Sequence, residues 1–258
     1  MYKKTYWLVR LVAAAVASIA LSSPAFALPS PNLGNSQGNE QSASSVPENP
    51  SVGANVDSAT NLKQAENYYN QGVSLQQQGK LEEAIAQYHE AIRLNPDLAV
   101  AHLNLGAALA ATGKREEAII AYKQAIALEP TLPEAYYNLA NALAQQGSLE
   151  EAIAQYHQAI RINPQYAKAY YNLGNVFAQQ GMRDAAITQW REAVRIQPEF
   201  AEAYANLGLI LSRSGQRREA VEAFKKARDL FKAQGKIQQA EQVDRLLQRI
   251  GTPPTAIT

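Results

Sequence analysis

The sequence predicts an all-α fold, an α-solenoid of five helix–turn–helix repeats followed by a C-terminal capping helix. Two observations lead to this prediction. A glycine or alanine returns every 34 residues, at Gly72, Gly106, Ala140, Gly174 and Gly208. An aromatic residue keeps the same spacing, at Tyr88, Tyr122, Tyr156, Trp190 and Phe224. So strict a period over five units is typical of an array whose repeats contact only their neighbours, rather than of one globular core.

Each unit shows the apolar periodicity of two helices of about a dozen residues. In the third unit, residues 133–166, Gly147 permits a tight turn between these helices. Glu150 then lies in the first turn of the second helix, where a carboxylate suits the helix dipole. We also expect Thr131 and Glu134 to form a capping box at the start of the first helix.

The unit resembles the tetratricopeptide repeat. With Ala65 as position one, the family pattern has aromatics at positions 4 and 24, Leu at 7, small residues at 8, 20 and 27, and Pro at 32. The third repeat carries it as Tyr136, Leu139, Ala140, Ala152, Tyr156, Ala159 and Pro164. The first repeat departs at Gln71 and the fifth at Lys232. The resemblance implies a right-handed superhelix whose first helices line a concave groove. It places the repeats, within 61–234, at 65–98, 99–132, 133–166, 167–200 and 201–234.

Residues 1–27 resemble a secretory signal peptide, with a basic start, an apolar run over 11–21 and a small-x-small site at 25–27. The run is shorter than the ~20 residues that a membrane span needs, so we expect cleavage. The alternative is an uncleaved anchor that begins at Tyr6. Export predicts a location in the periplasm or outside the cell, or in the thylakoid lumen of a photosynthetic source. The chain has no cysteine, which excludes disulfides and lipid attachment through a thiol.

Other segments flank the repeats. Residues 28–60 are rich in Pro, Ser and Asn and poor in large apolar side chains, which predicts a disordered linker. Residues 235–251 form an amphipathic pattern that predicts a helix capping the last repeat. A dimerisation helix is the alternative. We expect the tail 252–258 to be disordered.

Charge is spread unevenly along the chain. Without the three basic residues of the signal segment, 21 basic and 23 acidic residues remain, which argues against nucleic acid as a partner. The stretch from Ser212 to Gly251 holds ten basic and five acidic residues. This basic end would suit an acidic partner or an anionic membrane surface, or is a solvated face.

No residue pattern indicates an active site. His89 and His157 share one repeat position and are expected at the surface, whereas His102 replaces an aromatic and is expected in the core. The Gly-Lys pairs at 79–80 and 113–114 lack the Ser or Thr that a phosphate-binding loop requires. We therefore predict a protein that is not an enzyme and that has no metal or cofactor.

Asparagine recurs on the predicted first helices at position six, at Asn70, Asn104, Asn138, Asn172 and Asn206. It is a poor interior helix residue, so five in register require a reason. We call these five residues the asparagine ladder. Either each amide bonds to the backbone of a neighbouring helix, or the ladder faces the groove and binds the N–H and C=O groups of an extended peptide. The second arrangement resembles the concave surface of the repeat region of the O-linked N-acetylglucosamine transferases, from which only the binding mode carries over.

Further polar residues extend the predicted peptide-binding site. They are Tyr137, Asn141 and Gln145 beside Asn138, and Tyr171, Asn175 and Gln179 beside Asn172. Tyrosine is a typical recognition residue because its body is apolar and its tip polar. We therefore predict an exported protein that holds an extended segment of a partner protein. The alternative is an assembly or oligomerisation scaffold that acts through the basic end and the capping helix. In that case a partner would be a second copy of the chain, in a homo-oligomer. Contact with a membrane is expected only through an uncleaved signal segment.

Overall fold

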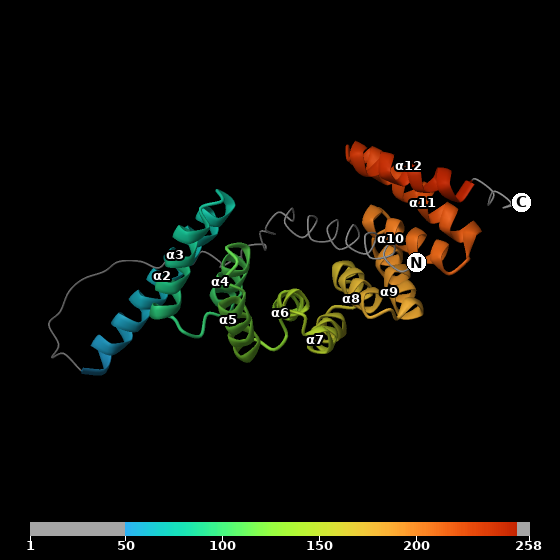
Figure 1. The fold of residues 1–258 in the computed structure, drawn as a ribbon. Coiled ribbons are helices and arrows are strands. Elements are labelled where there is room, and N and C mark those ends of the chain that lie inside the picture. The colour runs from blue at the N-terminus through green and yellow to red at the C-terminus, as the bar shows by residue number, and fades with distance from the viewer. Residues whose placement is uncertain (1–49, 252–258) are drawn as a thin grey trace, which may run out of the picture. The chain divides into compact units, whose positions relative to one another are not determined.

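The computed structural model describes residues 50–251, with side chains from 59 to 250 (Figure 1). All regular elements in this range are α-helices. The predicted signal segment 1–27, most of the predicted linker 28–60 and the predicted tail 252–258 lie outside the described residues.

The helices alternate between first and second helices of the repeats, as predicted. Their bounds are α2 (Pro50–Gln77), α3 (Leu81–Leu94), α4 (Ala99–Ala111), α5 (Arg115–Leu128), α6 (Pro133–Gln146), α7 (Leu149–Ile162), α8 (Ala167–Gln179), α9 (Arg183–Ile196), α10 (Ala201–Arg213), α11 (Arg217–Ala233) and α12 (Ile237–Gly251). Even-numbered helices from α2 to α10 are first helices, and α12 is the additional C-terminal helix. This order confirms the all-α class and the helix–turn–helix repeats of the predicted solenoid.

The chain divides into two compact units after Glu117, within α5. In the first unit, α3 packs against both α2 and α4. In the second unit, α6 pairs with α7, α8 with α9 and α10 with α11, and each pair packs against the next.

Glycine at the turn inside each repeat is required by backbone conformation. Gly147 has φ of 94° and ends α6, and the amide of Ser148 donates to the carbonyl of Leu143 at 3.0 Å. This left-handed conformation is natural for glycine and strained for other residues. The equivalent turn glycines also have positive φ, at Gly79, Gly113, Gly181 and Gly215.

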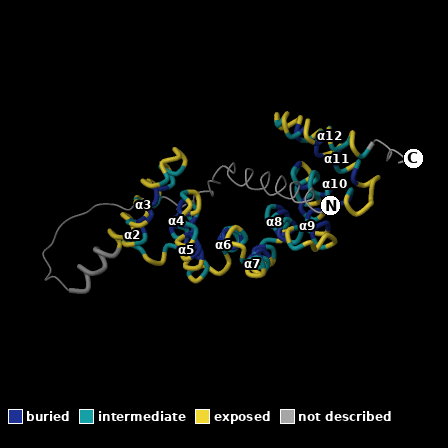
Figure 2. The backbone as a smooth tube through the Cα atoms, viewed as in Figure 1, coloured by how far each residue is buried: buried dark blue, intermediate teal, exposed yellow. Residues whose placement is uncertain are grey.

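In repeats one, four and five, the aromatic residue of the second helix fills the space beside the glycine at position eight of the first helix. In the second unit Trp190 is 4% exposed and Phe224 is 1% exposed. A β-carbon added to Gly174 would lie 2.6 Å from Nε1 of Trp190, and one added to Gly208 would lie 2.6 Å from Cδ1 of Phe224. Close packing of the ring on the opposing backbone therefore explains the small residue at position eight. Figure 2 shows buried stretches of the backbone recurring along the helices of the second unit.

Helix α12 covers the apolar face that α11 would otherwise expose. Phe231 and Ala227 of α11 belong to one buried cluster with Ala240 and Val243 of α12. Figure 1 shows α12 lying along α11. The capping role predicted for residues 235–251 is thus the role that the structure gives to this helix.

The start of α2 differs from the sequence-based boundary. The predicted disordered segment runs to residue 60, but α2 begins at Pro50. Proline suits the first turn of a helix, because the N–H that it lacks would have no partner within the helix there. The helix therefore includes residues 50–60.

The predicted capping box at the start of α6 is wrong. The N-cap is Leu132, with φ of −92° and ψ of 97°, and no side chain caps the helix. Helices α4, α8 and α10 begin at the equivalent position, after Leu98, Tyr166 and Phe200, also without a side-chain cap. The helix start therefore follows the register of the repeat, which puts Thr131 and Glu134 one residue out of register.

Candidate functional site

The asparagine ladder joins consecutive repeats in the second unit. Nδ2 of Asn172 donates to the hydroxyl of Tyr137 at 3.1 Å and to Oδ1 of Asn141 at 2.8 Å. One repeat later, Nδ2 of Asn206 donates to the hydroxyl of Tyr171 at 3.4 Å and to Oδ1 of Asn175 at 2.9 Å. The ladder therefore has a structural role, through neighbouring side chains rather than through the backbone bonds that the sequence suggested. Both N–H groups of each amide are used.

The asparagine at position nine is the centre of each junction. Oδ1 of Asn141 also accepts a hydrogen bond from the hydroxyl of Tyr156 at 2.6 Å. Oδ1 of Asn175 likewise accepts from Nε1 of Trp190 at 3.2 Å. One carbonyl oxygen thus links a first helix, its own second helix and the following repeat.

The first unit contains a reduced form of this junction. Nδ2 of Asn104 donates to the hydroxyl of Tyr69 at 3.1 Å. Position nine is Val73, which has no acceptor, and the hydroxyl of Tyr88 donates instead to Oε1 of Gln76 at 2.7 Å. Asn70, the first member of the ladder, is exposed.

The tyrosines predicted to recognise a ligand are packed inside the array. The rings of Tyr137 and Tyr166 lie 4.9 Å apart between centroids, and those of Tyr171 and Phe200 lie 4.6 Å apart. Tyr171 is only 8% exposed. The structure therefore uses these two side chains to join repeats, because their hydroxyls meet the amide of the next repeat.

Burial also raises the pKa values of these phenols, which extends the pH range in which they are neutral. Desolvation raises the pKa of Tyr171 to about 12, although hydrogen bonds with Asn175 and Asn206 oppose the shift. Desolvation likewise raises the pKa of Tyr137 against hydrogen bonds with Asn141 and Asn172. Each phenol therefore stays neutral at physiological pH and can accept the amide N–H.

Asn138 differs from the ladder members that follow it. It is half-buried, and among the described residues no hydrogen bond of its side chain is recorded. Gln145 and Gln179, at the ends of α6 and α8, are exposed. Asn138 and these two glutamines thus keep their amides available.

The histidines have surface or turn positions. His89 and His157 are exposed, as predicted. His102 is half-buried rather than in the core, and its Nε2 lies 3.0 Å from the carbonyl oxygen of Pro96. Within residues 59–250, no three His, Cys, Asp or Glu side chains gather where they could hold a metal ion. No helix of the described part of the chain is both long and apolar enough to span a membrane.

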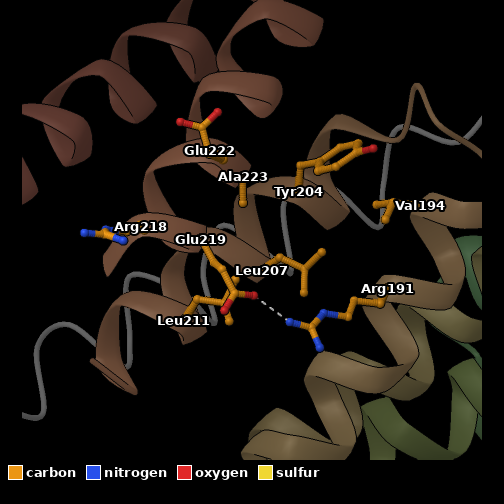
Figure 3. A pocket seen from close by; sticks show the side chains of 9 residues that line it. All are labelled: Arg191, Val194, Tyr204, Leu207, Leu211, Arg218, Glu219, Glu222 and Ala223. Atoms are coloured by element: carbon orange, nitrogen blue, oxygen red, sulfur yellow. Dashed lines mark hydrogen bonds and ion pairs between the residues drawn. The ribbon is translucent and has the colours of Figure 1, made fainter. Parts of the chain in front are cut away.

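A pocket that the sequence did not predict lies between α9, α10 and α11 (Figure 3). Its volume is about 460 Å³, and its apolar lining comes from Val194, Tyr204, Leu207, Leu211 and Ala223. The pocket depends on side chains from three helices, so no local sequence pattern marks it. The one sequence signal near it is the basic start of α11.

Comparison with known families identifies the repeat. The model described as "TPR repeat" matches residues 72–113, 108–147, 140–181 and 183–215, and that described as "Tetratricopeptide repeat" matches 201–234. The chain therefore belongs to the tetratricopeptide-repeat family, which makes it a protein–protein interaction module.

Solved structures agree with this assignment. A crystal structure of MamA is 33% identical, covers 64% of this chain and 96% of its own, and superposes with a TM-score of 0.59. The chain also resembles YrrB, at 24% identity, 76% and 96% coverage and a TM-score of 0.57. Pseudomonas aeruginosa PilF shares the fold alone, at 18% identity, 74% and 94% coverage and a TM-score of 0.62. No curated protein is similar enough to the chain to count as a match.

Proposed function

We propose that this protein binds an extended segment of a partner protein along the first helices of the second unit, α6, α8 and α10. The observation that carries the proposal is which hydrogen-bonding groups of the ladder amides already have partners within the protein. The N–H groups of Asn172 and Asn206 are occupied by the preceding repeat, which fixes the orientation of both amides. Each then has a carbonyl oxygen as its remaining polar group, held in place before any ligand arrives.

This arrangement selects for backbone N–H donors. An extended peptide carries unpaired N–H groups at regular intervals, and the ladder offers one fixed acceptor per repeat. Oδ1 of Asn172 has a long contact of 3.5 Å with Nδ2 of Asn175, so it retains acceptor capacity. Asn138 starts the row with its whole amide available, so it can both donate to and accept from a peptide.

The expected affinity is modest. Three ladder amides, each accepting one bond worth roughly 0.5–1.5 kcal/mol net, give about 1.5–4.5 kcal/mol. Ordering the peptide backbone opposes this by about 1–2 kcal/mol per residue. Contacts with side chains such as Gln145 and Gln179 must add to the total, and we expect a dissociation constant in the micromolar range or weaker.

The fold is compatible with peptide binding. YrrB, whose crystal structure has an unusual peptide-binding site, shares it. The signal-like segment 1–27 supports export, and the partner would then be an exported protein as well. The alternative function, an assembly scaffold that binds through α12, is less well supported. The apolar residues Ala240 and Val243 of that helix are already buried against α11.

The test starts from peptides selected from a random display library on the full chain. Isothermal titration calorimetry then compares each peptide on the wild type, on Asn138→Ala and on His157→Ala, an exposed residue of α7 that serves as the matched control. We expect Asn138→Ala to weaken binding by about tenfold, since a hydrogen-bonding site is lost, and His157→Ala to leave it unchanged.

A second arm tests the chemistry of the ladder directly. Each selected peptide is remade with single backbone N-methyl groups, which remove one N–H donor at a time. Loss of affinity at regularly spaced methyl positions supports acceptance by the asparagine oxygens. Peptides that bind Asn138→Ala as tightly as the wild type, and that tolerate N-methylation throughout, would remove the ladder from the function.

A further inference from the structure

The pocket between α9, α10 and α11 is wide open to solvent, and both apolar and charged side chains line it (Figure 3). We call the charged side chains its rim. Leu207 and Leu211 of α10 and Val194 of α9 form the apolar part. The rim carries Arg191, Arg218, Glu219 and Glu222. A volume of about 460 Å³ is ample for one large apolar side chain.

The rim charges are not equally compensated. Arg191 and Glu219 form an ion pair at 2.7 Å, which Figure 3 shows as a dashed line. Glu222 is paired with Lys225 at 3.1 Å. Among the described residues, no ion pair of Arg218 is recorded, although its side chain reaches the rim. The uncompensated charge of the rim is therefore positive.

Two more arginines adjoin Arg218. Arg213 ends α10 and Arg217 begins α11, and the tight turn through Gly215, with φ of 77°, brings these two helix ends together. The guanidinium of Arg217 donates to the carbonyl of Ile250, which holds the end of α12 beside the same turn. Both Arg213 and Arg218 are exposed.

This basic turn departs from the other repeats. The first turns of α3, α5 and α7 each carry two glutamates, and that of α9 carries Asp184. Helices α5 and α9 also begin with one arginine, but α11 begins with two, Arg217 and Arg218, although cations at a helix N-terminus oppose the helix dipole. Its one acidic residue in the first turn, Glu219, is already paired with Arg191. An anionic partner would relieve this unfavourable placement.

We propose that this pocket and the adjoining arginines form a second binding site, separate from the asparagine ladder, for a partner segment in which acidic residues flank one large apolar residue. The apolar side chain enters the pocket over Leu207 and Leu211. The flanking carboxylates meet Arg218 and its neighbours Arg213 and Arg217, where charge-assisted bonds to guanidinium groups are favourable.

Charge complementarity favours this occupant over segments of the chain itself. The tail that follows α12, residues 252–258, contains no acidic side chain, so it offers fewer carboxylates to the three arginines than an acidic partner segment does. A second copy of the chain would compete only if it presented both an apolar residue and carboxylates.

The test uses a fluorescein-labelled peptide Asp-Glu-Leu-Glu-Asp and the full chain, followed by fluorescence anisotropy. Two matched peptides isolate the chemistry, one with Ser in place of Leu and one with Asn and Gln in place of the acids. Arg218→Glu removes the rim charge, and Ala223→Phe fills the pocket. Arg161→Glu, an exposed arginine of α7, is the control for net charge, and Asn138→Ala is the control for the ladder.

We expect the acidic apolar peptide to bind the wild type about tenfold more tightly than either matched peptide, and Arg218→Glu and Ala223→Phe each to weaken it by about tenfold. Arg161→Glu and Asn138→Ala should leave this binding unchanged. Affinity should also fall as salt is raised, because exposed charges are screened. If Ala223→Phe loses its helical circular dichroism, Val194→Phe replaces it.

Three results would overturn the proposal. Equal binding to wild type and Arg218→Glu would exclude the arginines. Binding that appears only after truncation at Gly251 would assign the pocket to residues 252–258. A dimer seen by sedimentation of the wild type and lost in Ala223→Phe would assign it to a second copy of the chain.

Discussion

The junction between repeats one and two and the junctions among repeats three to five solve the same packing problem with different numbers of hydrogen bonds. In the second unit, Asn172 and Asn206 each donate to two acceptors of the preceding repeat. In the first unit, Asn104 has one such acceptor, the hydroxyl of Tyr69. The difference comes from position nine, which is asparagine in repeats three and four and Val73 in repeat one. A single side chain thus decides whether a ladder amide keeps a spare N–H group.

The largest effect should come from removing the ring that fills the junction in repeat four. Trp190→Ala should lower the free energy of unfolding by about 3–5 kcal/mol, because the ring is buried and a cavity remains. Urea denaturation followed by circular dichroism measures this value. Trp190→Phe is the control, since it keeps most of the ring and removes the donor to Asn175. A loss below about 1 kcal/mol for Trp190→Ala would contradict the packing described here.

Alkaline pH should weaken the hydrogen-bonded junctions next. The pKa of Tyr171 is raised by burial to about 12 in the folded state, against about 10 in the unfolded chain. Above pH 10 the unfolded state therefore holds fewer protons, so the contribution of Tyr171 to stability is fully present below pH 10 and falls by about 2 kcal/mol as pH rises to 12. Urea denaturation at several pH values checks this. Tyr171→Phe should make the dependence less steep, since buried tyrosines such as Tyr122 and Tyr137 also have raised pKa values and remain. An unchanged slope in that variant would contradict the assignment.

Converting a second-unit junction into the first-unit type tests the comparison directly. Asn175→Val removes the acceptor of Asn206 and of Trp190, and should destabilise by about 1–3 kcal/mol. Gln179→Val, at an exposed position of the same helix, is the matched control. Equal effects of the two substitutions in urea denaturation would show that the hydrogen bonds add nothing beyond helix propensity.

The reverse conversion should give the smallest effect. Val73→Asn supplies the acceptor that the spare N–H of Asn104 lacks, and should raise the free energy of unfolding by about 0.5–1.5 kcal/mol. Val73→Ala is the control, because it removes the apolar side chain without adding an acceptor. Thermal melting of both variants measures the difference. If Val73→Asn is destabilised as much as Val73→Ala, the hydrogen bonds of the second-unit junctions cannot be built into the first unit by this single substitution.

The sequence predicted the fold well because the features that build it are periodic. Every buried aromatic of the second helices and every turn glycine recurs at a fixed spacing, so their shared role follows from register alone. The two differences concern the starts of helices, at Pro50 and at Pro133. The expected capping box at Thr131 overlooked the repeat register, because the first helices α4, α8 and α10 also start directly after an apolar residue, as α6 does after Leu132.

The candidate site was harder to predict than the fold. The sequence located the ladder but not its partners, because Asn172 and Tyr137 lie 35 residues apart and meet only after two repeats stack. The residue type of Tyr171 suggested a role in ligand recognition, yet its ring packs against that of Phe200 inside the protein. The pocket of Figure 3 was not predicted at all, since three helices contribute its walls. Polar side chains that are available to a ligand can be identified only after the hydrogen bonds within the protein are known.

The asparagines at position nine, Asn141 and Asn175, also affect the cooperativity of unfolding. In a linear array, unfolding is governed by the intrinsic stability of each repeat and by a coupling energy between neighbours. Asn141 and Asn175 each contribute to both quantities, because one oxygen serves its own repeat and the next. Repeats three to five should therefore tend to open as one cooperative block, whereas repeats one and two, with a weaker coupling, should exchange their amide hydrogens first.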